Sequence, residues 1–269
     1  MTGVQSAPAG TDVGMRPAFN AARAHRALVV ALFGLAALGW LWTARLMSGM
    51  DNGPWSALGT FGWFIGVWVV MMAAMMFPSV APTVALYARM STGSGWKPAA
   101  FAGGYLVTWA AAGVVAYVIG VLVNDAAGDL LSWMNAGRPL AGVTLIVAGV
   151  YELTPVKNVC LGKCRSPLGF LIGSWREGWS GALRMGMKNG AWCVGCCWAL
   201  MAALFALGVM SILWMAVVAG LIAIEKTLPW RRTATYATAA ILLALGVLVL
   251  IFPGLFMPSA STPPTMGGM

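Results

Sequence analysis

The residues AAFAGGYLVTWAAAGVVAYVIGVLV at positions 99–123 contain no Asp, Glu, Lys, Arg or His. An uncharged run of this length is what an α-helix needs to cross the roughly 30 Å hydrocarbon core of a bilayer. Comparable runs lie between Asp51 and Arg89, between Lys188 and Glu225, and from residue 233 to the end. Because these runs lack the alternating polarity of membrane β-strands, the sequence predicts an all-α, polytopic transmembrane helix bundle.

The composition of the chain excludes a soluble globular domain. Of its 269 residues, 60% are hydrophobic and only 9% are charged. The net charge of +9 does not indicate a nucleic-acid-binding surface, because the Lys and Arg residues stand in short clusters beside apolar runs, as topology signals do. The lipid bilayer is therefore the expected partner, and nucleic acid is not.

We expect a single transmembrane helical domain over residues 27–252 with seven spans. The spans are placed at residues 27–47, 57–77, 99–123, 139–154, 185–207, 209–225 and 233–252. The run between Lys188 and Glu225 is divided into two helices with a tight turn near Gly208. Residues 1–26 predict a disordered tail, and residues 253–269, which carry no charge, predict an irregular tail.

Basic residues alternate between the connections of these spans. Clusters of Lys and Arg precede the first span and occupy the second, fourth and sixth connections, whereas the other connections are poor in basic residues. The positive-inside rule then predicts a cytoplasmic N-terminus and an extracytoplasmic tail 253–269. The segment 155–184 is too charged to cross, and its apolar side chains recur on roughly one helical face. It is predicted to lie in the cytoplasmic interface.

The five cysteines fall in two groups. Cys160 and Cys164 lie in a basic loop, and Cys193, Cys196 and Cys197 lie near the cytoplasmic end of the fifth span. On a helix, the last three share one face. Both groups are expected in a reducing compartment, where stable disulfides are disfavoured. Since thiolates bind soft metals, all five are candidate ligands; thiol redox chemistry and helix packing are the alternatives.

Methionines add a second group of soft ligands at the end of the second span. Two pairs at four-residue spacing precede Pro78, and they comprise Met71, Met72, Met75 and Met76. Thioether sulfur is a soft donor, although methionine also serves in ordinary packing and lipid contact. Pro78 and Pro82 interrupt the backbone hydrogen bonds of this helix. Because such a break at membrane depth is tolerated where it is buried or lines a cavity, we expect a pocket near the methionines.

Few other side chains can take part in chemistry. Glu152 and Glu225 are the carboxylates nearest this layer, and each is a candidate auxiliary ligand, a proton acceptor or a partner for Lys157 or Lys226. The only histidine, His25, lies in the predicted tail, which excludes histidine-based haem, iron and zinc sites. No phosphate-binding or dinucleotide-binding glycine pattern supports work driven by ATP or NAD.

Three stretches resemble one bacterial family. They are VMMAAMMFPSVAPTVALYA from Val70, GVYELTPVKNVCLGKCRSPLGF from Gly149 and GALRMGMKNGAWCVGCCWALMAALFALGVMSILWMA from Gly181. The family is an uncharacterised one of predicted metal-binding integral membrane proteins, some of which are labelled copper chaperones. The likeness covers roughly residues 30–250. It implies a copper-handling protein of the bacterial inner membrane whose metal ligands are the cysteines and methionines named above.

The sequence thus favours a non-enzymatic protein that binds Cu(I) and serves copper delivery or the maturation of a membrane cuproenzyme. A structural zinc site made of four thiolates from the same two motifs is an alternative. A thiol-redox enzyme that relays electrons to a partner is a second class, although no outer cysteine pair is present to receive them. An assembly subunit of a membrane complex, with packing cysteines, is a third. Copper export is a fourth, but no energy-coupling motif supports it.

Overall fold

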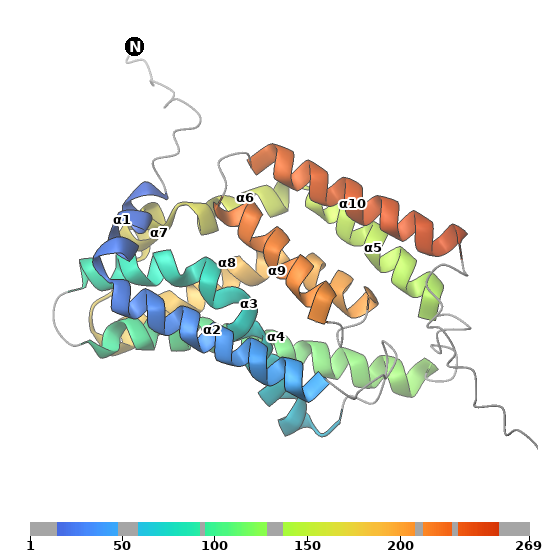
Figure 1. Ribbon diagram of the computed structural model, residues 1–269, viewed down its shortest axis with the longest axis horizontal. Coiled ribbons are helices and arrows are strands. Elements are labelled where there is room, and N and C mark those ends of the chain that lie inside the picture. Colours follow the sequence, from blue (N-terminus) through green and yellow to red (C-terminus); the bar gives the residue numbers. More distant parts are fainter. Residues whose placement is uncertain are drawn as a thin grey trace, which may run out of the picture.

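The structure, a computed structural model, describes residues 15–47, 59–91, 95–127, 137–207, 212–227 and 231–252. In these ranges every regular element is helical, and no strand occurs. The helices are α1 (Arg16–Ala24), α2 (Arg26–Met47), α3 (Phe61–Met90), α4 (Trp96–Ala127), α5 (Arg138–Glu152), α6 (Pro155–Arg165), α7 (Pro167–Ser174), α8 (Gly178–Leu207), α9 (Ile212–Thr227) and α10 (Arg231–Ile251). Figure 1 shows the long helices packed side by side in one bundle.

Five helices of the described chain are long and apolar enough to cross a membrane: α2, α3, α4, α8 and α10. The consecutive helices α5 and α6 pass the same criterion as a pair that bends by 66°, which gives up to six spans. The 16-residue helix α9 corresponds to the predicted sixth span. The all-helical prediction is confirmed, and so is the division of 185–225 into two helices. The predicted turn near Gly208 lies outside the described residues, as do 1–14 and 253–269.

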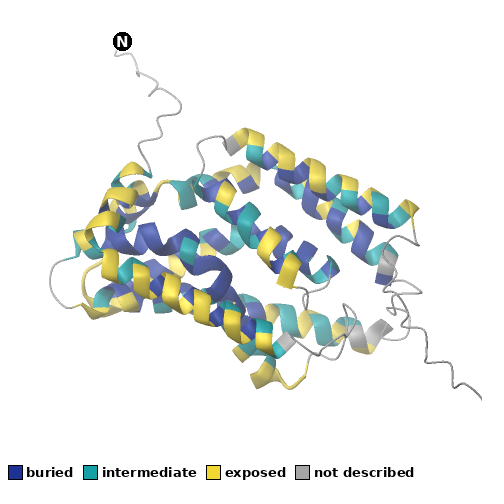
Figure 2. Ribbon diagram, in the orientation of Figure 1, coloured by how far each residue is buried: buried dark blue, intermediate teal, exposed yellow. Residues whose placement is uncertain are grey.

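The lipid-compatible surface of the bundle is clearest on α2. Figure 2 shows exposed residues along the outer side of this helix. Val30, Leu35, Leu38 and Leu41 on α2 are between 54% and 68% exposed, whereas Ala36 is buried. A soluble protein rarely leaves so many large apolar side chains together in water. The outward face of α2 therefore suits contact with lipid.

The predicted disordered tail 1–26 requires a correction. Residues 16–24 form the helix α1, with Pro17 in its first turn. Ala18 and Ala21 are fully buried, and α1 packs against α3 and α7. The short alanine side chains give α1 a narrow apolar face, and contact with the bundle stabilises a helix that would be marginal in isolation.

The predicted end of the second span at Phe77 was also wrong. Helix α3 continues through Pro78 and Pro82 to Met90. A proline in a helix interior costs about 3 kcal/mol or more because it removes a backbone donor and crowds the preceding turn. Here residues 79–87 are all buried, so tertiary packing outweighs that cost. The prolines do not terminate the helix.

Helix α8 is central to the bundle, since it contacts α4, α5, α6 and α9. Its closest approach is to α4, where Gly186 meets the carbonyl group of Phe101 and Gly104 meets that of Leu183. A methyl group added at either glycine would overlap the facing backbone. The missing side chains let the two backbones approach closely, as in small-residue contacts of membrane helices. This approach places the cysteine-bearing turn of α8 beside α4.

The predicted interfacial segment folds as α6, α7 and the first turns of α8. Its apolar residues divide between two environments. Phe170 and Leu171 on α7 are buried in the bundle, whereas Ile172 and Trp179 are 63% and 61% exposed. The single apolar face expected for this segment is therefore only partly present.

Candidate metal centre

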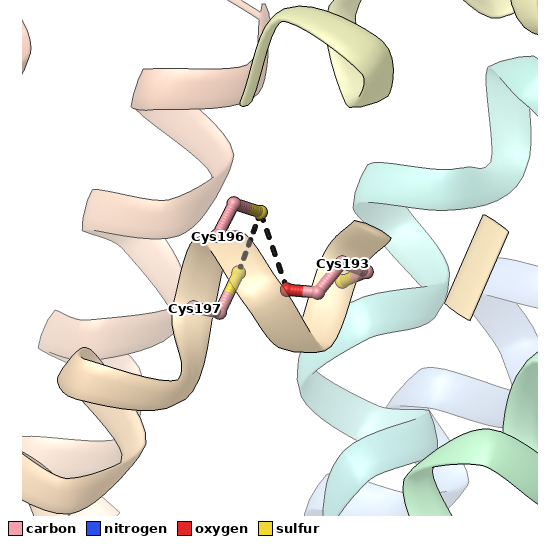
Figure 3. Close-up of side chains that lie close together, drawn as sticks. All are labelled: Cys193, Cys196 and Cys197. Atoms are coloured by element: carbon pink, nitrogen blue, oxygen red, sulfur yellow. Dashed lines mark hydrogen bonds between the residues drawn. The ribbon is translucent and has the colours of Figure 1, made fainter. Parts of the chain in front are cut away.

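Three cysteines on one turn of α8 form a compact group of sulfur atoms. The Sγ atoms of Cys193, Cys196 and Cys197 all lie within 4.8 Å of one another, and each residue is 2% exposed. Figure 3 shows the sulfur atoms of Cys196 and Cys197 facing each other, and they are 3.3 Å apart. The Cys196 thiol also donates to the Cys193 carbonyl oxygen at 3.2 Å. The helical spacing had predicted this shared face.

The second cysteine motif lies on a helix, α6, and packs against the same turn of α8. Thr154 caps α6 by accepting a hydrogen bond from the Lys157 backbone N–H at 3.4 Å. Cys164 Sγ lies 3.8 Å from Cys196 Sγ. A methyl group added at Gly195 of α8 would lie 3.0 Å from Cys160 Sγ. Both motifs therefore meet, with Cys164 touching the three-sulfur group and Cys160 lying against the backbone beside it.

The sulfur spacing fits a thiolate-bound metal ion. A metal–sulfur bond of about 2.3 Å places two sulfur atoms of a tetrahedral site about 3.8 Å apart, and two opposite ones in a linear site about 4.6 Å apart. The sulfur atoms of Cys196 and Cys197 are 3.3 Å apart, those of Cys164 and Cys196 are 3.8 Å apart, and no two in the three-sulfur group are more than 4.8 Å apart. These distances bracket the values for tetrahedral and linear sites. Small rotations of side chains would accommodate a soft ion among these sulfur atoms.

Cys193 has two further partners that the sequence analysis did not identify. The Lys226 ammonium group on α9 donates to Cys193 Sγ at 3.0 Å, and the Tyr105 hydroxyl on α4 lies 2.9 Å from the same atom. Lys226 is 6% exposed and Tyr105 is 1% exposed. A buried ammonium group at this distance offsets the negative charge of a thiolate. In the sequence, Lys226 follows the apolar run 189–224 and Glu225, which indicates a topology signal or a partner for a glutamate but not a contact with Cys193.

Glu152 and Glu225 meet Lys157 and do not join the three-sulfur group. The Lys157 ammonium group pairs with both carboxylates, at 2.7 Å for Glu225, and all three side chains are almost fully buried. Arg165 donates to the Glu225 carbonyl oxygen at 2.5 Å. These contacts connect α5, α6 and α9. Of the roles predicted for the two glutamates, the structure shows the pairing with Lys157.

The four candidate methionines on α3 are buried in the bundle. None of Met71, Met72, Met75 and Met76 exceeds 3% exposure. Ser79, one turn further along, donates to the Met76 carbonyl oxygen at 2.9 Å and accepts a hydrogen bond from Lys226 at 3.4 Å. The methionine turn is thus connected to Cys193 through Ser79 and Lys226. Ligation by these thioethers stays a prediction.

Comparison with known proteins places the chain in a family. No curated protein and no solved structure shows significant similarity to it. The model of the family described as "PpoB2: Copper chaperone" matches residues 65–249, from α3 to the last turn of α10. The match covers more than half of the chain and includes both cysteine motifs, which confirms the resemblance stated above. The chain therefore belongs to the PpoB2 copper chaperone family.

Proposed function

We propose that this membrane protein carries Cu(I) on the three-sulfur group of α8 and delivers it for the maturation of a membrane cuproenzyme. The observation that carries this proposal is the convergence of Cys193, Cys196 and Cys197, whose buried sulfur atoms lie within 4.8 Å of one another. Thiolates prefer soft ions, and Cu(I) accepts two or three of them. The family description supports copper as the cargo.

The charge beside the sulfur atoms favours Cu(I) over a structural Zn(II) ion. Two thiolates and one Cu(I) carry a net charge of −1, which the Lys226 ammonium group balances at Cys193. Four thiolates and one Zn(II) carry −2, so half of that charge would stay unbalanced by Lys226. Because uncompensated charge is costly in a buried site, Cu(I) held by two thiolates suits this environment. The third sulfur then serves as the incoming or outgoing ligand.

Cys164 provides a route to the buried group. Cys160 and Cys164 are half-buried, whereas the cysteines of α8 are almost inaccessible to solvent. Copper would enter at α6 and pass from Cys164 to Cys196 across 3.8 Å. In this exchange one copper–sulfur bond forms as another breaks, and the oxidation state of copper does not change. The methionines of α3 would offer a weaker receiving shell.

For this function, the protein would lie in the bacterial inner membrane with α6 at the cytoplasmic end of the bundle. A soluble thiol donor would then load Cys160 and Cys164, and the acceptor would be a membrane metalloenzyme or another subunit of its complex. Structural zinc is the second candidate, since the 3.8 Å contact of Cys164 with Cys196 equals the edge of a four-thiolate zinc site.

Metal analysis of protein loaded with Cu(I) under reducing conditions tests the proposal. We expect close to one copper per chain in the wild type and almost none in Cys193→Ser/Cys196→Ser/Cys197→Ser. Cys160→Ser is the matched control and should retain copper. Zinc that survives copper loading, with four sulfur ligands by X-ray absorption, would favour the structural site. A wild type that binds neither metal would refute both candidates.

Loading kinetics test the route through α6. Cys164→Ser removes the sulfur that contacts Cys196 and leaves the three cysteines of α8 intact. We expect the same final copper content but slower uptake from a chromophoric Cu(I)–chelator complex, by about tenfold or more. Uptake at the wild-type rate would show that copper reaches α8 by another path.

A further inference from the structure

A cavity of about 440 Å³ lies at the end of the bundle where α7 ends and α8 begins. It is separate from the cysteine site. Its walls come from the end of α7, from the segment that follows α7 and from the first turns of α8, and they include Ser174, Trp175, Arg176, Arg184, Met185 and Lys188. This space is larger than a phosphate ion alone requires.

The backbone around this cavity is tightly built. Gly178 adopts a φ of 79°, a conformation that glycine tolerates and that turns the chain from the connecting segment into α8. A methyl group added at Gly181 would overlap the backbone of Arg176, so the segment is folded closely back on the first turn of α8. The Arg176 backbone N–H also donates to Met185 Sδ at 3.3 Å. The cavity is thus a fixed feature of the chain reversal.

The walls of the cavity carry positive charge without a lining carboxylate. Arg184 and Lys188 are four residues apart on α8 and therefore share a face, and Arg176 approaches from the connecting segment. In the part of the chain that the structure describes, none of these three cations pairs with a carboxylate, and Glu177 does not line the cavity. The Lys188 ammonium group donates to Ser174 Oγ at 2.8 Å, which holds it at the cavity.

Apolar side chains adjoin these cations in the wall of the cavity. Met185 at the cavity is buried, whereas Ile172, which also lines it, is 63% exposed. Trp179 in the first turn of α8 does not line the cavity and is 61% exposed. Exposed Trp and Ile next to Arg and Lys are typical of a surface at the level of lipid headgroups. A ligand for this site combines an anionic phosphate with an adjoining apolar part.

We propose that this cavity binds the phosphate of an anionic phospholipid headgroup. The two guanidinium groups and the ammonium group donate to the phosphate oxygens, the Ser174 hydroxyl lies beside them, and an acyl chain extends from the cavity along the exposed Ile172. Cys193 follows Arg184 by nine residues and Lys188 by five on the same helix. At 1.5 Å per residue, the three-sulfur group lies roughly 8–14 Å further along α8 than these cations.

Native mass spectrometry of the full-length protein in detergent tests this site. The probes are phosphatidylglycerol, phosphatidylcholine and inorganic phosphate. We expect one phosphatidylglycerol to bind in preference to phosphatidylcholine, and Arg184→Gln/Lys188→Gln to weaken that binding roughly 10- to 30-fold. The matched control Arg89→Gln/Lys163→Gln removes the same charge at exposed positions outside the cavity and should retain the preference.

Three results would overturn the proposal. Equal losses in both double variants would show a general effect of charge. An unchanged preference in Arg184→Gln/Lys188→Gln would place the lipid elsewhere. Displacement of the lipid by an equal concentration of inorganic phosphate would identify a free anion as the ligand. None of these results depends on copper binding, so the lipid site and the copper site can fail independently.

Discussion

Replacing Lys226 by Met tests the electrostatic argument at the copper site most directly. The substitution removes the ammonium group 3.0 Å from Cys193 Sγ and keeps an unbranched apolar side chain of similar length. At an effective dielectric constant of about 20, two unit charges at this distance interact by about 5 to 6 kcal/mol. Part of this energy offsets the cost of burying the ammonium group, so the net loss should be smaller.

We therefore expect Lys226→Met to weaken Cu(I) binding by about 2 to 3 kcal/mol, or roughly 30- to 150-fold. Lys226→Arg keeps the positive charge and is the matched control, with an expected change below tenfold. Competition against a Cu(I) chelator of known affinity measures both. If Lys226→Met bound Cu(I) within threefold of the wild type while folded, charge balance by Lys226 would be refuted, and with it the preference for Cu(I) over Zn(II).

Two further predictions concern the stability of the bundle, measured by thermal unfolding in detergent. Lys157→Met leaves two buried carboxylates without their shared cation, so we expect a loss of about 3 to 5 kcal/mol and partial recovery when both glutamates are changed to Gln. Gly186→Ala forces a methyl group against the α4 backbone and should cost about 1 to 3 kcal/mol, whereas Gly34→Ala, which meets open space, should be neutral or slightly stabilising. Equal effects of the two alanine substitutions would contradict the close α4–α8 contact.

The helices were predictable wherever local composition decides the structure. The charge-free run at 99–123 lies within α4, and the run between Lys188 and Glu225 falls into α8 and α9 as expected. The errors occur where distant packing overrides a local preference. Pro78 and Pro82 stay inside α3 because the turns around them are buried, and α1 is helical because alanines contact the bundle.

The candidate site likewise has one feature that local spacing predicts and others that require the tertiary structure. Helical periodicity alone placed Cys193, Cys196 and Cys197 on one face, since residues three and four apart always meet on a helix. It could not assign the partner of each charged residue, because Lys226 lies 33 positions from Cys193 in the sequence. The two adjacent residues Glu225 and Lys226 in fact reach different partners. Such pairings depend on how helices cross.

By itself, the sequence determined an all-helical protein with long apolar helices and a thiol-rich turn in one of them. The tertiary structure alone decided that Cys164 meets Cys196, that Lys226 and Tyr105 flank Cys193, and that three cations surround one cavity at the end of the bundle. The physical reason is the distance along the chain over which each kind of interaction acts. Hydrophobicity and helical spacing act between near neighbours in the chain, whereas buried charges and sulfur atoms find partners only after the helices have packed.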